Sequence, residues 1–220
     1  MDESRFTIIV LHGSERGSNK EFFDQMFGLR HEVFAKNRKP AASTLDAPGV
    51  DKYDDDDDAI YFLELDADQR VRASMRITPT VKSSLIADHF PELIDKGKAA
   101  RGPTIYELNR HVWLTPQEER VQIRETVRLL KAVLEWCLAR RLSHLQILID
   151  AAALPSYLAL SPLTRPLGLP HPYVSNFEES GEIELIAVRW PICPQLLQDI
   201  GRFQNATGGA SISIRPKTVN

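Results

Sequence analysis

Hydrophobic and polar positions along the chain predict strands that alternate with helices. Short apolar runs bounded by turn residues predict strands at residues 6–11, 60–65, 71–78, 104–113, 145–149 and 182–190. Apolar residues at helical spacing predict helices at residues 19–30, 83–96, 115–142 and 154–160. This order, with paired strands early and a long helix before a short buried strand, predicts an α/β (or α+β) fold.

Turn and capping residues sharpen two of these elements. The early pair of strands is expected to form an antiparallel hairpin that turns at residues 66–69. The long helix has three start signals, because Thr115 suits the N-cap, Pro116 suits the first helical position and Glu118 completes a capping box. It is expected to run to about Leu142.

Length and composition fit one domain with a buried core. The chain has 220 residues, of which 43% are hydrophobic and 26% are charged. We expect residues 1–220 to form a single domain, with the Gly-, Ser- and Thr-rich tail after about residue 206 loosely held. The formal net charge of −3 argues against broad nucleic-acid binding, which needs a basic surface.

The remaining composition favours a cytoplasmic protein without a metal centre. Cys137 and Cys193 lie far apart in apolar segments, which is typical of reduced thiols rather than a disulfide. No Cys or His spacing suggests a metal site, and the six histidines form no catalytic triad, so the sequence assigns them no role. The chain shows neither a signal-peptide pattern nor a membrane-spanning apolar run, so we expect no membrane association.

Charged residues in four separate segments are the main candidates for chemistry. Arg30 and Phe34 are one helical turn apart and therefore share a helix face. Arg76 lies near the end of the second hairpin strand. Glu107 and Arg110 are three positions apart on a predicted strand, so they point to opposite faces unless the strand is bulged or twisted.

A long segment, residues 36–58, separates the first helix from the hairpin. Its prolines, its glycine and its acidic run predict an ordered loop that covers a site. Asp51 and Asp54 stand within it, and residues 55–58 are expected to form a solvated turn. The acidic run lacks the ligand spacing and the glycine of an EF-hand calcium loop.

Taken in order, these motifs resemble those of the acyl-homoserine lactone synthase (autoinducer synthase) family. Seven residues carry the resemblance: Arg30, Phe34, Asp51, Asp54, Arg76, Glu107 and Arg110. It implies a three-layer sandwich of the GCN5-related N-acyltransferase type, with a mixed central sheet and a V-shaped cleft between two splayed strands, here residues 104–113 and 145–149. In one departure from the family pattern, Pro40 stands where a Trp is usual.

The resemblance also implies two co-substrates, S-adenosylmethionine and an acyl thioester, and no permanently bound cofactor. S-adenosylmethionine carries a sulfonium, an ammonium and a carboxylate, which acidic, aromatic and guanidinium groups can bind. The matching positions for it are Arg30, Phe34, Asp51, Asp54 and Arg76. Glu107 and Arg110 match catalytic positions, with Glu107 as the base for the attacking amine. Lactonisation would then release methylthioadenosine and yield a quorum-sensing signal.

The sequence leaves the acyl donor open between acyl carrier protein and acyl-coenzyme A. An acidic carrier protein could dock on basic residues of the long helix, although a solvated helix face explains them equally well: Arg120, Arg124, Arg128, Lys131, Arg140 and Arg141. The candidates for the wall of an acyl pocket are Leu148, Leu154, Leu158 and Leu160. Two other functions stay open, namely an acyltransferase of the same fold for a different amine, and a binding homologue that has lost catalysis.

Overall fold

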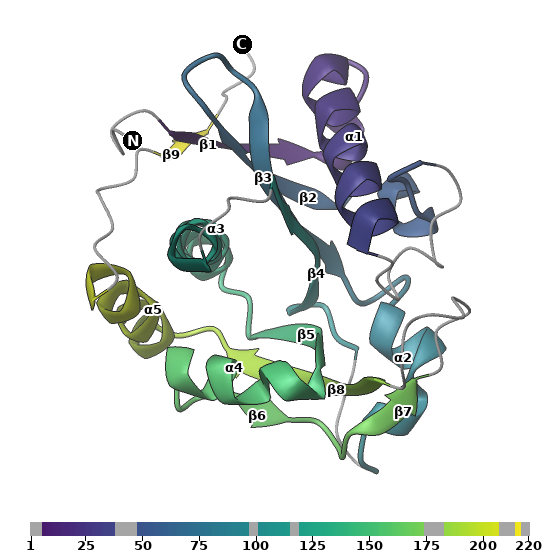
Figure 1. The fold of residues 1–220 in the computed structure, drawn as a ribbon. Coiled ribbons are helices and arrows are strands. Elements are labelled where there is room, and N and C mark those ends of the chain that lie inside the picture. The colour runs from purple at the N-terminus through teal and green to yellow at the C-terminus, as the bar shows by residue number, and fades with distance from the viewer. Residues whose placement is uncertain are drawn as a thin grey trace.

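A mixed β-sheet with helices on both faces forms the centre of the molecule (Figure 1). The computed structural model describes residues 6–37, 48–96, 101–114, 119–173, 183–206 and 214–216. In these residues the sheet has nine strands: β1 (Thr7–His12), β2 (Ile60–Leu65), β3 (Val71–Pro79), β4 (Ile105–Trp113), β5 (His144–Asp150), β6 (Arg165–Pro166), β7 (His171–Tyr173), β8 (Ile183–Pro191) and β9 (Ile214–Pro216).

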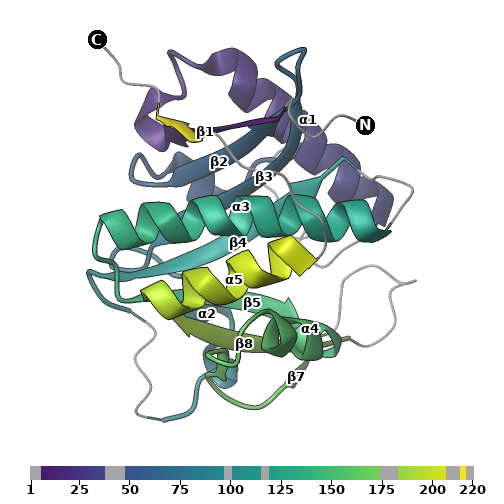
Figure 2. The same cartoon turned by 90° about the vertical axis from the view of Figure 1, so that its left-hand side faces the viewer.

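The strand order is β6-β8-β5-β4-β3-β2-β1-β9, with β7 also paired to β8. Neighbouring strands are antiparallel except for β4 with β5 and β1 with β9, which are parallel. Figure 2 shows α3 and α5 side by side across one face of the sheet, with α1 behind it. The α-helices are α1 (Lys20–Asn37), α2 (Leu85–His89), α3 (Glu119–Ala139), α4 (Leu154–Leu160) and α5 (Pro194–Ala206). The predicted three-layer arrangement is therefore confirmed.

Several element boundaries differ from the sequence prediction for identifiable reasons. The helix predicted at 83–96 is only α2 followed by a single 3-10 turn, η5 (Pro91–Leu93), because proline cannot continue a helix. Helix α3 ends at Ala139, and Arg141 then adopts a positive φ of 56°. Its predicted capping residues, 115–118, lie outside the described residues.

Three edge strands and one helix have no counterpart in the sequence prediction. Helix α5 begins with a proline and buries Leu196 and Ile200 beside α3. Both are helix signals that the sequence contains but the prediction did not use. Strands β6, β7 and β9 are two or three residues long, too short to show a periodicity. Strand β9 lies in the tail that was expected to be loosely held, and it pairs with β1.

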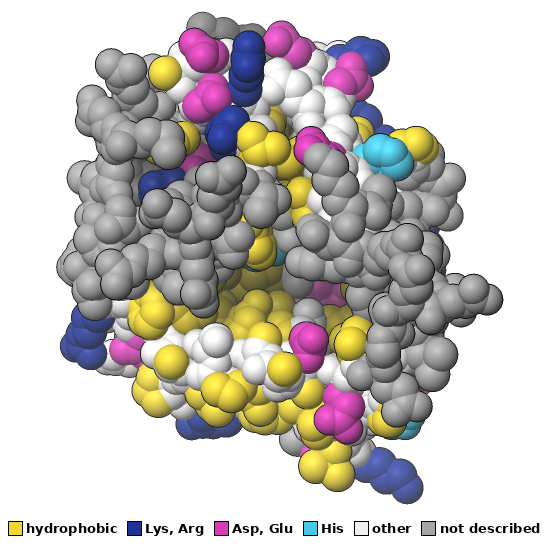
Figure 3. Space-filling model, viewed as in Figure 1, with side chains coloured by type: hydrophobic (Ala, Val, Ile, Leu, Met, Phe, Trp, Pro, Cys, Tyr) yellow, Lys and Arg dark blue, Asp and Glu magenta, His cyan; other side chains and the backbone are white. Residues whose placement is uncertain are grey.

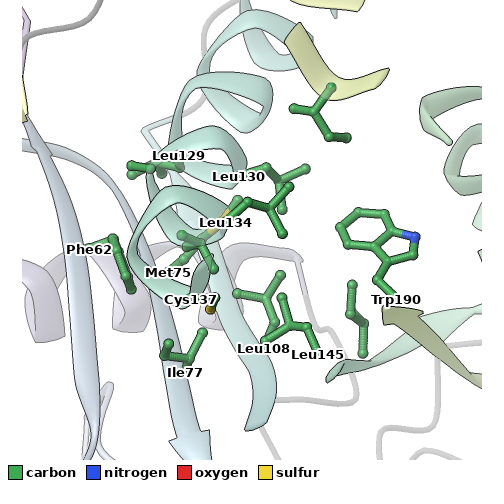
Figure 4. Close-up of a cluster of buried hydrophobic side chains, with 14 of the residues drawn as sticks. Phe62, Met75, Ile77, Leu108, Leu129, Leu130, Leu134, Cys137, Leu145 and Trp190 are labelled. Carbon is green, nitrogen blue, oxygen red and sulfur yellow. The ribbon is translucent and has the colours of Figure 1, made fainter. Parts of the chain in front are cut away.

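Helix α3 covers the main hydrophobic core (Figure 4). Its side chains meet apolar residues that point out of the sheet from β2, β3, β4, β5 and β8. The buried side chains of this contact include Phe62, Met75, Leu108, Leu130, Leu134, Cys137, Leu145 and Trp190. A second cluster packs α1 on the opposite face of the sheet, where Phe23 and Met26 meet Tyr61 and Leu63. None of the helices in the described part of the chain is long and apolar enough to cross a membrane.

Strands β4 and β5 separate partway along their length. They are in register only from Ile105 to Leu108 on β4 and from His144 to Ile147 on β5. Beyond this stretch, β4 continues along β3 to Trp113, and β5 continues along β8. Figure 3 shows a hollow with hydrophobic walls on the face seen in Figure 1, where the two strands diverge. The splayed pair of strands that was predicted is therefore confirmed.

Candidate functional site

Five of the seven motif residues converge into one buried network of charges. Asp54 accepts hydrogen bonds from Arg30 Nη1 at 2.8 Å and from Arg76 Nη1 at 2.6 Å. Asp51 accepts two bonds from Arg76, at 2.7 and 3.0 Å, and one from Arg110 Nε. No side chain in the network is more than 9% exposed. We call these five residues the arginine–aspartate network.

The two aspartates are positioned by their own short helical turn, η4 (Lys52–Asp55). Asp51 caps this turn by accepting the Tyr53 N–H at 2.9 Å, and Asp54 accepts the Asp51 N–H at 2.9 Å. The reciprocal bonds form a capping box, the arrangement that the Asp-x-x-Asp spacing allows. Just before it, Gly49 has a φ of +75°, and a Cβ there would lie 2.0 Å from the Phe27 carbonyl oxygen on α1. A glycine is therefore required for the segment to lie against α1.

A bulge in β4 brings Arg110 into the network. Arg76 pairs with Asn109, but Ser74 pairs with Val112, so β4 has one residue more than β3 between these pairs. Arg110 has a φ of +52° at this point. Asn109 accepts a bond from Arg76 Nε at 2.8 Å and Arg110 bonds to Asp51, so two consecutive side chains lie on the α1 face. The spacing of Glu107 and Arg110 called for a bulged or twisted strand, and the bulge is present.

Phe34 closes the network on the side of α1. The Arg110 guanidinium carbon lies 5.4 Å from the centre of the Phe34 ring, and Phe34 is buried. Arg30, one turn earlier on the same helix, lies 5.7 Å from the ring centre of Tyr61. Both contacts are within the range of cation–π attraction. The shared helix face predicted for Arg30 and Phe34 therefore points toward one site.

Charge pairing determines the ionisation of the network. Burial would raise the pKa of Asp51, but Arg76 together with Arg110 outweighs it and lowers that pKa. Burial also opposes ionisation of Asp54, whose pKa is lowered by Arg30 and Arg76. Three arginines face two aspartates, so the network carries a net positive charge. Such a site favours an anionic group of a ligand, such as a carboxylate.

Glu107 is not a member of the network. Its Oε1 accepts bonds from the Ser84 hydroxyl and from Ile86 N–H, and its Oε2 accepts the Leu85 N–H at 2.7 Å. These donors belong to the first turn of α2, so the carboxylate holds the start of that helix against β4. Burial raises the pKa of Glu107, against the lowering effect of the three hydrogen bonds. Since a carboxylate oxygen can accept two bonds, Oε2 retains capacity for another donor.

Three further residues belong to the site although the sequence analysis gave them no role. Asn109 bonds to Arg76, and the Tyr61 hydroxyl donates to Asp54 Oδ1 at 3.0 Å. Tyr53 is 4% exposed, and its hydroxyl has no hydrogen-bond partner within the described residues. Burial raises the pKa of Tyr53, and the nearby charges of Glu107 and Asp88 raise it further. Only Tyr53 had a sequence signal, since it lies inside the Asp51–Asp54 motif.

The leucines predicted to line an acyl pocket do not share one surface. Leu148 packs into a cluster with Ile86 and Leu93, next to α2. Leu154 and Leu160 on α4 pack against the core beneath α3. Leu158 is 43% exposed, because it lies on the outer side of α4. Leu154 and Leu160 therefore pack against one hydrophobic cluster, Leu148 packs against another, and Leu158 packs against neither.

Four of the six basic residues offered for a carrier-protein surface have described side chains; of these Arg128 is buried, Lys131 is partly exposed, and Arg140 and Arg141, just after α3, are exposed. Arg128 is buried, and its Nε donates to Glu64 Oε2 at 2.9 Å, so it does not belong to a solvated basic face. Arg140 stacks over Trp136 with its guanidinium carbon 3.9 Å from the ring centre. Lys131 lies 3.9 Å from Glu135. The side chains of Arg120 and Arg124 lie outside the described residues.

Two other sequence features have different outcomes. Asp55, Asp57 and Asp58 are exposed, as expected for a solvated turn, and Asp58 pairs with Lys82 at 2.7 Å. Pro40, where the family pattern has Trp, lies outside the described residues. Across the described part of the chain, no group of three or more His, Cys, Asp or Glu residues could hold a metal ion.

Comparison with known proteins supports one family. The autoinducer synthase family model matches residues 14–189. The isovaleryl-homoserine lactone synthase of Bradyrhizobium diazoefficiens is 29% identical over 164 residues, which are 74% of this chain and 73% of the relative.

Solved structures agree with this similarity. The CoA-dependent acyl-homoserine lactone synthase BjaI, with SAM and isopentyl-CoA, has a TM-score of 0.78 at 26% identity, and the match covers 98% of this chain and 95% of that one. A protein named as an N-acetyltransferase from Lactobacillus plantarum shares the fold, with a TM-score of 0.54 at 14% identity over 85% of this chain and 99% of that one. Since the family model spans most of the sequence, this chain belongs to the autoinducer synthase family.

Proposed function

We propose that this protein is an N-acyl-L-homoserine lactone synthase that transfers an acyl group to the amine of S-adenosylmethionine and then closes the lactone. The observation that carries the proposal is the position of the arginine–aspartate network. It holds a net positive charge in a buried place, and Arg110 anchors it to β4 within the stretch where β4 has separated from β5. An amino-acid substrate and an acyl thioester in the cleft can therefore meet at one strand.

The network supplies the groups that an amino-acid sulfonium needs. The excess arginine charge attracts the substrate carboxylate. Arg30 has donors to spare for it, because its Nε and Nη2 have no hydrogen-bond partner in the described part of the chain. Phe34 offers an aromatic face that favours the sulfonium. Asp51, Asp54 and Arg76 hold these groups in place through their mutual bonds. The aspartates therefore act mainly by orienting arginines.

Acyl transfer requires a neutral amine. We assign Glu107 to accept the ammonium proton, directly or through water, at Oε2. Its raised pKa suits this task because it makes the carboxylate a stronger base than an exposed one. The amine then attacks the thioester carbonyl, whose oxygen can accept a backbone N–H in the cleft, and an amide and a free thiol form.

Lactone formation needs no further substrate. The carboxylate of the acylated intermediate displaces methylthioadenosine from its own γ-carbon, and both reacting groups belong to one bound molecule. Arg110, fixed by Asp51 and next to Phe34, is placed to steady that carboxylate.

Acyl-coenzyme A is the donor that we propose. The relative BjaI is named as CoA-dependent, and Arg128, one of the residues offered for a carrier-protein surface, is buried against Glu64. The proposed enzyme is cytoplasmic, where both co-substrates occur, and it holds no permanent cofactor. A short branched acyl group is the first candidate, because the Bradyrhizobium relative is named for isovaleryl.

The test is incubation of the purified protein with S-adenosylmethionine and a panel of acyl thioesters. The panel should contain isovaleryl-coenzyme A, straight-chain acyl-coenzyme A and acyl carrier protein loaded with the same groups. Mass spectrometry is expected to show acyl-homoserine lactone and methylthioadenosine in equal amounts. Acylation of another amine without methylthioadenosine would indicate the alternative acyltransferase, and binding without turnover would indicate a homologue that has lost catalysis.

A further inference from the structure

His111 lies on β4 in the stretch that has separated from β5, and the reaction steps described above give it no role. It is half-buried. Its Nε2 lies 3.4 Å from the Thr126 hydroxyl on α3, and its ring centre is 4.5 Å from that of Trp113. Trp113 packs against the core beneath α3, whereas Val112 belongs to the cluster beneath α1. His111 therefore faces α3, the side opposite to the arginine–aspartate network.

The bulge at Arg110 determines this orientation. Asn109 and Arg110 both bond to network residues on the α1 face, so alternation resumes with His111 on the α3 face. Without the extra residue, regular alternation would exchange the two side chains, placing Arg110 toward α3 and His111 toward the network. One backbone feature thus sets a guanidinium on one face and an imidazole on the other.

This placement matches a need of the proposed reaction. In the proposed reaction the network holds the amine on the α1 face, and the thioester carbonyl lies between β4 and β5. Because the amine attacks from the α1 face, the sulfur leaves toward the α3 face. An alkyl thiolate is a basic leaving group that departs more easily when it is protonated. We propose that His111 is a catalytic residue that donates a proton to this sulfur, an inference that rests on the proposed function.

The step balances without another reagent. When the tetrahedral intermediate collapses, the C–S bond breaks, its electron pair passes to sulfur, and the imidazolium proton of His111 bonds to that sulfur. Glu107 first releases the ammonium proton to solvent and then passes on the second proton, which the attacking nitrogen loses as the amide forms; solvent reprotonates the imidazole. The net change is an amine and a thioester converted to an amide and a thiol.

Leaving-group dependence tests the proposal. One acyl group is supplied on a graded series of thiols, from pantetheine to nitrothiophenol, and the rate without enzyme is subtracted. Because an aryl thiolate leaves without a proton, His111→Gln is expected to lose about 100-fold in kcat with the pantetheine ester but less than about threefold with the aryl ester. Equal loss along the series, or no loss, would overturn the role.

Two further variants keep the result interpretable. Thr126→Val leaves the imidazole in place but removes its hydroxyl neighbour, so a smaller loss with the same leaving-group dependence is expected even if His111→Gln does not fold. His171→Gln replaces an exposed histidine on β7 and is expected to leave both rates unchanged. Wild-type protein that forms no lactone from any thioester would refute the proposed function itself, a different result from a flat leaving-group series.

Discussion

Replacing Arg76 with methionine tests whether charge pairing holds the arginine–aspartate network together. Arg76 is fully buried and donates four hydrogen bonds, to Asp51, Asp54 and Asn109. Without Arg76, Asp51 keeps only Arg110 and Asp54 keeps only Arg30 among the arginines of the network, and the four hydrogen bonds of Arg76 are lost. Loss of a partner from a buried ionic cluster typically costs about 3–5 kcal/mol. We expect Arg76→Met to lower the free energy of unfolding by this amount at pH 7, measured by urea denaturation with circular dichroism.

The pH dependence of that loss checks its cause. In the wild type the pKa of Asp51 and of Asp54 is lowered, so the stability they contribute is present above their unfolded pKa and is lost as the pH falls through the folded value. Without Arg76 each carboxyl keeps one arginine, so its folded pKa lies closer to the unfolded value and its charged form contributes less stability. The difference between variant and wild type should therefore be constant near neutral pH and narrow as the pH falls below the unfolded value of 3.8, where the wild type loses this contribution.

An exposed ion pair provides the control for this experiment. Lys82 pairs with Asp58 at the surface, so Lys82→Met should leave the urea midpoint unchanged. A loss below about 1 kcal/mol in Arg76→Met, or a loss that does not change with pH, would refute the reasoning. The network would then be held by packing rather than by charge.

Three further predictions concern the site. Glu107→Gln should lower kcat by about 10²–10⁴-fold. Because the pKa of Glu107 is raised above 4.5, a pH–rate profile of the wild type should show activity declining at a pH above that value, and the residual activity of the variant should show no such decline. Gly49→Ala should destabilise the protein by about 1–3 kcal/mol, because its φ is positive and the new Cβ would overlap the Phe27 carbonyl; thermal unfolding at an unchanged midpoint would contradict this. Tyr53→Phe should leave stability equal or higher, since the lost hydroxyl has no partner in the described residues, and a loss above about 1 kcal/mol by urea unfolding would reveal one.

The sequence was most informative where local pattern and geometry act together. Period-two and helical spacing located the principal strands, and α4 has the predicted bounds, because both patterns follow from burial of one face. The spacing of Glu107 and Arg110 was informative in another way. On a regular strand these residues point to opposite faces, so a shared surface required a bulge or a twist, and the structure has a bulge at Arg110.

The sequence could not predict side-chain positions that depend on contacts between distant parts of the chain. Glu107 carries the charge expected of a member of the site, but α2 folds over it and donates three bonds, and no local pattern encodes the position of α2. Arg128 has the spacing of an exposed helix residue, yet it bonds to Glu64 on β2, 64 positions away. Pairings between residues so distant in sequence depend on the fold as a whole, so single-sequence patterns do not contain them.

The backbone at Arg110 joins these observations into one argument. A residue other than glycine at positive φ costs about 1–2 kcal/mol, and such strain persists only where surrounding contacts enforce it. Here the contacts are the bond to Asp51 and the stacking on Phe34. If strain of this kind marks function, the residue that carries it should lie where the two substrates meet. In the proposed reaction Arg110 lies there, with the network on its own side and His111 directed toward α3 on the other.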